Sequence, residues 1–508
     1  MKNPPPPQQP EEIELKLALP TRAPTALAEQ LARTPLLARR KPTQLPLHNI
    51  YFDTPGQLLH QARVALRLRR VGSEASPQWL QTLKMGGRSD SALSQRGEWE
   101  APVPGPALSW QALQATPWSG LDPDGSVFKA LAPCFATDFE RTRWTVRKRD
   151  HSVVEVALDI GHVGLGEQRT PICELELELL AGPPGALFDV ARQIARSVAV
   201  LPANTSKAER GYALALGTLA LPRRAQPPAL APGMALSDAA QCVLREMFAQ
   251  FTTNLDTLRS SDDPEVVHQA RVGWRRFRSA LRLFRPALAA HPLPSWQALK
   301  PLLSFMGALR DLDVARTDTL PPLAEAYAAG DASRAAKWQA LDQALAQAAA
   351  LQRKSVRYAL EAPALGSALL ATTEWLETLP GANVPAVKGR QKTQLRRWAR
   401  RRITRLHAQL ERALKDASNP DRQHRARILA KRLRYGVEAL RPLLPRGQAK
   451  RWTQQATTLQ TGLGASRDMV QAGVLAASLD ADRALVEFLR GVAVGQQRDT
   501  LLPAANAR

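Results

Sequence analysis

The stretch EEIELKLAL, Glu11 to Leu19, alternates charged and apolar side chains with the two-residue period of a β-strand. One face of this strand carries both signs of charge and the other is aliphatic. The charged positions are Glu12, Glu14 and Lys16, and the apolar ones between them are Ile13, Leu15 and Leu17. A strand of this kind is typical of a sheet with one face in water, or of a closed barrel whose interior is charged.

Further alternating runs, separated by turn residues, follow over the first 220 residues. They include HNIYFDTP, VALRLRRV, QWLQTLKM, RGEWEAPV, RTRWTVRKR, SVVEVALDIGHV and ICELELELL. Together with the first run they predict at least eight mostly antiparallel strands, with helical pieces around 24–40 and 185–200.

The charged faces of these strands fall into two kinds. Early and late strands carry carboxylate pairs, such as Glu174 and Glu176, whereas middle strands carry arginine pairs. The arginine pairs are Arg67 with Arg69 and Arg141 with Arg143. Carboxylate oxygens suit Mg²⁺ or Mn²⁺, and paired guanidiniums suit phosphate oxygens. The pattern alone leaves open both a wet sheet face and a cavity for a metal–polyphosphate complex.

Composition narrows the class of protein. The chain of 508 residues is long enough for two domains, and 44% hydrophobic content fits a soluble globular protein. No apolar run has membrane-spanning length, the N-terminus lacks a signal peptide, and we expect no membrane partner. The three dispersed cysteines, Cys134, Cys173 and Cys242, indicate neither a disulfide framework nor a cysteine metal site. A cytoplasmic protein is therefore expected.

Charge divides the chain at a linker rich in proline and alanine. Residues 1–220 hold 25 basic and 22 acidic side chains, whereas residues 221–508 hold 44 and 24, so the net charge of +23 lies almost wholly in the second part. An excess of this size favours a polyanionic partner. The predicted organisation is a disordered leader at 1–8, a β domain at 9–215, a linker at 216–234 and a helical domain at 235–500.

The β half resembles the CYTH family, the triphosphate tunnel metalloenzymes. The resemblance rests on Glu12-x-Glu14-x-Lys16 and on YFDTP, LRLRR, TLK, RGEWE, ICELELEL and SKAERGYAL, which follow in that family's order over about residues 9–215. It implies an eight-stranded antiparallel tunnel, open at both ends, that binds tripolyphosphate and Mg²⁺ or Mn²⁺.

The resemblance also implies roles for individual residues. The expected metal ligands are Glu12, Glu14, Glu174 and Glu176, although Glu178 shares their face and the register could differ by two. The expected phosphate-binding residues are Lys16, Arg67, Arg69, Lys84, Arg141, Arg143 and Lys207. Glu12, Glu14, Lys16 and Lys207 are expected to be catalytic.

The implied activity is that of a metal-dependent triphosphatase, an acid anhydride hydrolase. We expect hydrolysis of tripolyphosphate to pyrophosphate and phosphate, because chains that join such a domain to a helical one resemble inorganic triphosphatases. Two alternatives stay open at this point. The tunnel could bind polyphosphate without cleaving it, as a granule-associated scaffold, or it could act on thiamine triphosphate, a nucleotide or an RNA 5′-triphosphate.

The helical half contains a duplicated basic helix. VHQARVGWRRFRSALRLFRP (267–286) carries cations from His268 to Arg285 at steps of three and four, opposite an apolar stripe. QHRARILAKRLRYGVEALRP (423–442) repeats both stripes 156 residues later, with Pro264 and Pro420 placed to start the helices. LRDLD (309–313) and SRDMV (466–470) repeat at an offset of 157. The repeats span about 237–385 and 390–500, and a third basic run at 396–406 is less regular and could be plain surface.

This half resembles the CHAD family across about residues 235–500. The resemblance implies an all-α domain of two four-helix bundles related by an approximate twofold, with a central groove that binds inorganic polyphosphate. The residues implied to bind it are His268, Arg271, Arg275, Arg276, Arg278, His424, Arg427, Lys431, Arg432 and Arg434. Such binding would allow association with polyphosphate granules.

Nucleic acid is the rival ligand, and the sequence disfavours it. Single-strand binders normally place aromatic residues among their cations, whereas Trp274, Phe277 and Phe284 fall on the apolar face of this helix. Asn and Gln, which read bases in duplexes, are scarce on the basic stripe. A featureless phosphate polymer fits the stripe better.

Overall fold

The computed structural model describes residues 11–20, 23–72, 77–88, 91–379, 390–415 and 420–501. The predicted disordered leader at 1–8 lies outside these residues. Within them, no helix combines the length and hydropathy that a membrane span requires. The chain divides into two compact units, and the main division falls between Leu221 and Pro222, inside the segment predicted as a linker.

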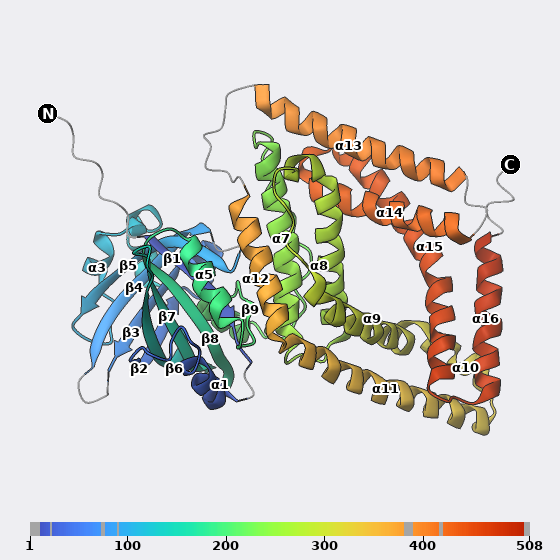
Figure 1. Ribbon diagram of the computed structural model, residues 1–508, viewed down its shortest axis with the longest axis horizontal. Helices are drawn as coiled ribbons and strands as arrows, with labels where there is room; N and C mark the ends of the chain where they lie inside the picture. The colour runs from blue at the N-terminus through green and yellow to red at the C-terminus, as the bar shows by residue number, and fades with distance from the viewer. Residues whose placement is uncertain are drawn as a thin grey trace. The chain divides into compact units, whose positions relative to one another are not determined.

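The first unit is built on a closed antiparallel barrel (Figure 1). Its strands run in the order β5-β4-β3-β2-β6-β7-β8-β1, and an additional pairing of β1 with β5 closes the ring. Their bounds are β1 Glu11–Ala18, β2 Thr43–Asp53, β3 Ala65–Val71, β4 Gln78–Arg88, β5 Leu93–Val103, β6 Ala132–Arg147, β7 Val153–Leu165 and β8 Gln168–Ala181. The two-residue strand β9 (Leu201–Pro202) adds to β1. The eight-stranded antiparallel prediction is confirmed.

Side-chain alternation decides which face of each strand lies inside. The aliphatic face of β1 packs outward: Leu15 and Leu17 are fully buried in a cluster with α1 (Pro24–Ala32) and α5 (Gly185–Ile194). The charged face is therefore the inside of the barrel. Glu14, Lys16 and Arg67 are 2%, 7% and 8% exposed, so the wet-sheet alternative of the sequence pattern is wrong.

One end of the barrel interior is filled by apolar side chains. Tyr51, Phe135 and Phe139 lie on the inner faces of β2 and β6 and pack against Tyr212 of α6 (Lys207–Ala215). Gly211 permits this packing, because a Cβ there would lie 2.1 Å from the ring of Phe135. The implied tunnel open at both ends is thus closed over by α6 at this end.

Two segments from the second half of the chain belong to the first unit. They are residues 255–261 and 360–377, the latter containing most of α12 (Pro363–Thr378). Leu370 of α12 is fully buried in the same cluster as Leu15 and Leu17, and Ser367 donates to the carbonyl of Ala195 at 3.3 Å. The sequence patterns gave no indication that this helix leaves the helical domain.

The second unit is all-helical, as predicted, and its long helices follow the internal repeat. The first repeat supplies α7 (Leu236–Thr257), α8 (Pro264–Leu283), α9 (Lys300–Val314) and α11 (Ala332–Leu360). The second supplies α13 (Arg390–Lys415), α14 (Pro420–Leu440), α15 (Arg446–Ser478) and α16 (Arg483–Leu501). Pro264 and Pro420 do begin α8 and α14, where the missing N–H costs nothing.

Candidate triphosphate tunnel and basic helical cluster

The clearest ionic group inside the barrel surrounds Lys207. Its Nζ lies 2.6 Å from Asp159 Oδ2, 2.6 Å from Glu174 Oε1 and 2.8 Å from Glu176 Oε1. Oxygens of these three carboxylates all lie within 4.8 Å of one another. Lys207 is placed here by the start of α6, where Ser206 and Glu209 form a capping box.

Two arginines and a lysine extend this group. Arg141 donates to Asp159 at 2.6 and 2.7 Å and also bonds Glu176. Arg210 Nη2 lies 3.1 Å from Glu174 Oε2. Lys16 Nζ lies 3.1 Å from Glu176 and 3.1 Å from Glu14, so it links this group to the next one along the barrel.

The second ionic group lies on β1, β4 and β5. Lys84 Nζ donates to both oxygens of Glu12, at 2.8 and 2.9 Å, and lies 3.1 Å from Glu98. Arg96 Nε lies 3.1 Å from Glu12. The register of β1 against β5, which places Glu12 opposite Arg96, brings these side chains together.

The remaining predicted phosphate-binding residues also face the interior. Arg67 lies 3.6 Å from Glu98, and Arg143, which is more exposed, lies 3.6 Å from Glu155. Arg69 Nε donates to Asn49 Oδ1 at 2.8 Å. Burial, followed by Arg67 and Arg141, lowers the pKa of Arg69 to about 10. A guanidinium that is crowded by cations is one that a bound anion would stabilise.

Glu178 shows the opposite crowding. It lies across from Glu14 on β1 and from Glu155 on β7, in the same barrel face as Glu174 and Glu176. Burial, followed by Glu12, Glu98 and Glu155, raises the pKa of Glu178 to about 7. This part of the interior therefore has more carboxylate than its cations neutralise.

The helical unit concentrates cations from both repeats in one basic cluster, made of Arg271 and Arg275 of α8, Arg310 of α9, Arg427 and Lys431 of α14, and Arg467 of α15. Burial, followed by Arg427, Arg275, Arg467 and Arg434, lowers the pKa of Lys431 to about 8. Burial and neighbouring arginines, Arg310 foremost, lower the pKa of His268 to about 4, so this imidazole is neutral at pH 7.

Comparison with known proteins matches each unit separately. A CYTH domain model matches residues 10–212, and a CHAD domain model matches residues 242–477. The chain carries a CYTH domain followed by a CHAD domain. In the CYTH domain, the strands follow one another around the barrel in a different order from the chain, since β1 pairs with β5 and β8 and β2 pairs with β3 and β6.

Individual relatives resemble one domain or the other. An inorganic triphosphatase of Haemophilus influenzae is 34% identical over 205 residues, which is 40% of this chain and 55% of that protein. The crystal structure of the CHAD domain from the plant Ricinus communis is 28% identical, with a TM-score of 0.46, over 55% of this chain and 91% of that one. A putative adenylyl cyclase from Hippeastrum, HpAC1, which has a dominant triphosphatase activity, is 18% identical, with a TM-score of 0.27, over 40% of this chain and 95% of that one.

The carboxylates inside the CYTH domain fit a divalent metal. Carboxylate oxygens are the donors that Mg²⁺ and Mn²⁺ prefer, and Asp159, Glu174 and Glu176 already converge around a cation, the ammonium of Lys207. The excess carboxylate near Glu178 is a second point of fit. The predicted ligands Glu12 and Glu14 lie outside the converging group and pair with Lys84, Lys16 and Arg96 instead.

Several interior residues of the CYTH domain were not predicted as functional. They are Asp159, Arg96, Glu98 and Arg210. The alternation of β7 places Asp159 on the inner face, opposite Glu174, and Arg96 shares the inner face of β5 with Glu98. The alternation of side chains along each strand thus indicated that these residues lie on the charged face. Only the pairing of the strands shows which carboxylates meet.

The CHAD domain brings together only part of its predicted set. Arg276 is 2% exposed, bonds Gln250 and lies 3.4 Å from Glu438, so it is an interior residue. Arg434 lies 3.6 Å from Glu438, and Arg278 is exposed. The side chain of His424 lies outside the described residues. Arg432 lines a separate pocket of this domain.

Arg310 and Arg467 were missed in the CHAD domain. They occupy equivalent positions of the LRDLD and SRDMV motifs, 157 residues apart. Each is followed by an aspartate, and burial raises the pKa of Asp468 although Arg427 and Arg467 oppose that shift. The internal repeat singled out these two positions in the sequence. That they lie beside the basic helices could be learned only from the structure.

Proposed function

We propose that this protein is a metal-dependent inorganic triphosphatase that hydrolyses tripolyphosphate to pyrophosphate and phosphate in its CYTH domain. The observation that carries the proposal is a closed ring of strands whose interior brings cations and carboxylates together, with Lys207 in contact with three carboxylates. The likeness to an inorganic triphosphatase, which covers 55% of that protein, supports the choice of substrate.

The proposed mechanism assigns the interior side chains to two tasks. Arg67, Arg69, Lys84, Arg141 and Arg143 would hold phosphate oxygens, since guanidiniums grip them bidentately and lysine acts as a compact charge. Asp159, Glu174 and Glu176 would hold the metal, with Glu12 and Glu14 as the further predicted ligands. A bound Mg²⁺ or Mn²⁺ supplies charge neutralisation and orients a water for attack on a terminal phosphorus.

Lys16 and Lys207 would position both the triphosphate and the carboxylates that hold the metal. Each lysine contacts Glu176, and each has a second carboxylate partner, Glu14 for Lys16 and Glu174 for Lys207. Arriving phosphate would compete for these ammonium groups and leave the carboxylates to the metal. The resulting site would stabilise the charge that develops on the pyrophosphate leaving group.

We propose in addition that the CHAD domain binds inorganic polyphosphate through the basic cluster. Like-charged side chains gathered from four helices have a cost in the free protein. Burial first, and like-charged neighbours second, lower the pKa values of Arg271, Arg427 and Lys431. A polyanion offsets that cost. Localisation on polyphosphate granules would follow from such binding.

The test of the enzymatic proposal is phosphate release from tripolyphosphate with Mg²⁺ or Mn²⁺, beside ATP, thiamine triphosphate, RNA 5′-triphosphate and long polyphosphate. We expect tripolyphosphate to be the preferred substrate and Glu14→Gln to lower its turnover by at least about a hundredfold, as loss of a metal-site group typically does. Glu29→Gln, which changes an exposed carboxylate, is the control. Undiminished turnover by Glu14→Gln would contradict the assignment, and tight binding without release would favour the scaffold alternative.

A further inference from the structure

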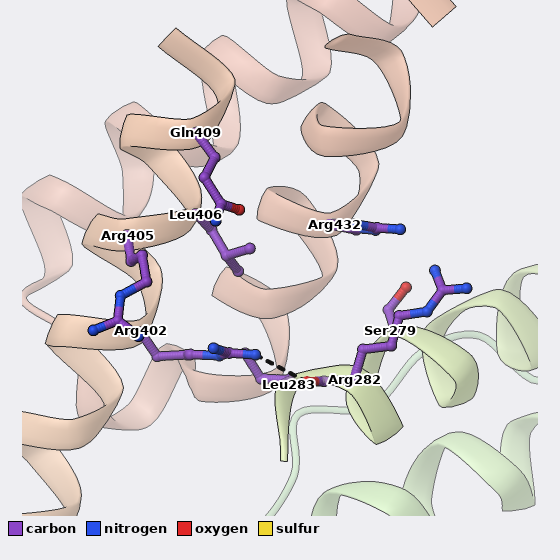
Figure 2. A pocket seen from close by; sticks show the side chains of 8 residues that line it. All are labelled: Ser279, Arg282, Leu283, Arg402, Arg405, Leu406, Gln409 and Arg432. Carbon is purple, nitrogen blue, oxygen red and sulfur yellow. Dashed lines mark hydrogen bonds between the residues drawn. The ribbon is translucent and has the colours of Figure 1, made fainter. Parts of the chain in front are cut away.

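A second basic site lies in the CHAD domain, where α8, α13 and α14 meet (Figure 2). Four arginines line this pocket: Arg282 from α8, Arg402 and Arg405 from α13, and Arg432 from α14. Arg282 and Arg432 belong to the two basic helices. Arg402 and Arg405 belong to the third basic run at 396–406, which on sequence alone could be plain surface. The pocket has a volume of about 130 Å³.

The pocket shares none of the six residues of the basic cluster. On α14, Lys431 lies in the cluster with Arg427, whereas the adjacent Arg432 lines the pocket. Consecutive helical positions point about 100° apart, since a turn takes 3.6 residues. Arg432, which the resemblance implied to be a polyphosphate-binding residue, therefore lines the pocket and lies apart from the basic cluster.

The four guanidiniums have no carboxylate among the residues that line the pocket. Burial and then Arg282 lower the pKa of Arg432, and burial and then Arg405 lower the pKa of Arg402. The Nε–H groups of Arg402 and Arg432 are buried and donate to no partner among the described residues. Such uncompensated crowding is unfavourable in the free protein and would be relieved by an anion.

The remaining lining residues indicate the class of anion. Ser279 and Gln409 add neutral hydrogen-bonding groups, and Leu283 and Leu406 are the apolar part of the wall. None of the residues that line the pocket is aromatic, so a nucleobase would lack the aromatic platform that single-strand binders provide. Arginine forks match phosphate oxygens, and the volume is several times the roughly 30 Å³ of a water molecule, which is suitable for a phosphate group.

We propose that this pocket is a second anion site that binds a short inorganic phosphate, with pyrophosphate as its simplest occupant. One guanidinium is already fixed in place: Arg402 Nη2 donates to the carbonyl of Arg282 at 2.9 Å (Figure 2). Arg282 of α8 and Arg405 of α13 are exposed and line the pocket. The site does not depend on the proposed reaction of the CYTH domain.

The test is calorimetric titration of the full-length protein with pyrophosphate at fixed ionic strength in EDTA. The pocket variant is Arg282→Gln with Arg405→Gln, because both side chains are exposed and neither is seen to form a hydrogen bond within the part of the chain that the structure describes. The control is Arg400→Gln with Arg401→Gln, which removes the same charge from exposed positions of α13. We expect the pocket variant to weaken one pyrophosphate site at least about tenfold and the control less than about twofold.

Further measurements keep the proposal falsifiable. Ser279→Glu, which places a carboxylate in the intact pocket, should abolish the same site while hydrolysis of tripolyphosphate continues. Equal losses in the pocket and control variants would show general charge attraction and overturn the proposal. It would also be overturned if long polyphosphate or single-stranded RNA lost as much affinity as pyrophosphate, because the pocket would then be part of a polymer-binding surface. If pyrophosphate does not bind at the pocket but tripolyphosphate is still hydrolysed, only the pocket proposal is overturned and the proposed function is unaffected.

Discussion

Lys207 is the counter-charge of three carboxylates, of which Asp159 and Glu174 are buried and Glu176 is half-buried. Asp159 and Glu174 are fully buried, and Lys207 is 5% exposed. Burial lowers and the three carboxylates raise the pKa of Lys207, with a net shift upward. Since the raised pKa lies above the unfolded value of about 10.4, this lysine contributes stability across the neutral range that is lost only at strongly alkaline pH.

Replacing Lys207 by Gln should therefore destabilise the CYTH domain. We expect a loss of about 3–5 kcal/mol in unfolding free energy at pH 7, as when one partner of a buried ion pair is removed. The loss should shrink at pH 5, where the orphaned carboxylates can take up protons, and Mg²⁺ should restore part of it. Urea denaturation measures these changes, with the exposed Lys129→Gln as control. A variant as stable as the control would show that these carboxylates tolerate their mutual repulsion.

Lys431 is the residue that should give polyphosphate binding its pH dependence. It is flanked by Arg427 and Arg434 on its own helix, by Arg275 on α8 and by Arg467 on α15. Because its pKa is about 8, it is largely charged at pH 7 and largely neutral at pH 9. Affinity for long polyphosphate should fall across this range by roughly three- to tenfold, the worth of about one phosphate contact. Fluorescence titration of the protein against a labelled polymer would measure it.

Lys431→Arg is the matched variant for that experiment. It keeps the charge above pH 9, so its affinity should vary little from pH 7 to 9. The same slope in both proteins would assign the pH dependence to another group.

At the residue scale, the sequence predicted the kinds of interior side chain better than their partners. Alternation placed Glu12, Lys84 and Arg141 on the charged faces of their strands, and the structure shows that these faces line the barrel interior. It could not show that Asp159 meets Glu174, because that depends on the register of β7 against β8. The CHAD resemblance implied that Arg276 binds polyphosphate, whereas its contact with Gln250 of α7 and its 2% exposure place its side chain in the interior.

At the scale of elements, strands and basic helices were predictable and helix α12 was not. Strand period, turn residues and the 156-residue repeat are local signals. The association of α12 with the barrel depends on contacts between residues that are far apart in the chain, such as Leu370 with the cluster containing Leu15. Its apolar sequence is equally compatible with packing among the other helices.

Leu370→Ala tests that association. Leu370 is fully buried, so the truncation should cost about 2–5 kcal/mol in the unfolding free energy of the CYTH domain. Leu351→Ala in α11, at a leucine that is 64% exposed, should cost almost nothing. Urea denaturation again provides the comparison.

A fragment that ends at Leu221 lacks α12 altogether and should unfold at a lower urea concentration than the same domain in the full chain. Equal midpoints would mean that α12 does not contribute to that core.

At the scale of the whole molecule, the two domains use charge in different ways. The CYTH half is nearly balanced, because its interior cations face carboxylates, whereas the helical half carries an excess of about twenty positive charges. Balanced charge of both signs suits a compact metal–triphosphate complex, and unbalanced charge suits a long polyanion. The two proposed activities should therefore respond to different substitutions.

Arg271→Gln with Arg427→Gln tests this separation, because it removes one cation of the basic cluster from each repeat. We expect affinity for long polyphosphate to fall at least about tenfold, from the loss of two charge-assisted contacts, while turnover of tripolyphosphate stays within about twofold. Arg334→Gln with Arg490→Gln removes the same charge from exposed ion pairs of α11 and α16 and should leave both activities unchanged. Equal effects of the two pairs on polymer binding would indicate attraction by net charge alone. A parallel loss of turnover would mean that tripolyphosphate reaches the barrel by way of the basic cluster, because no residue of that cluster belongs to the barrel.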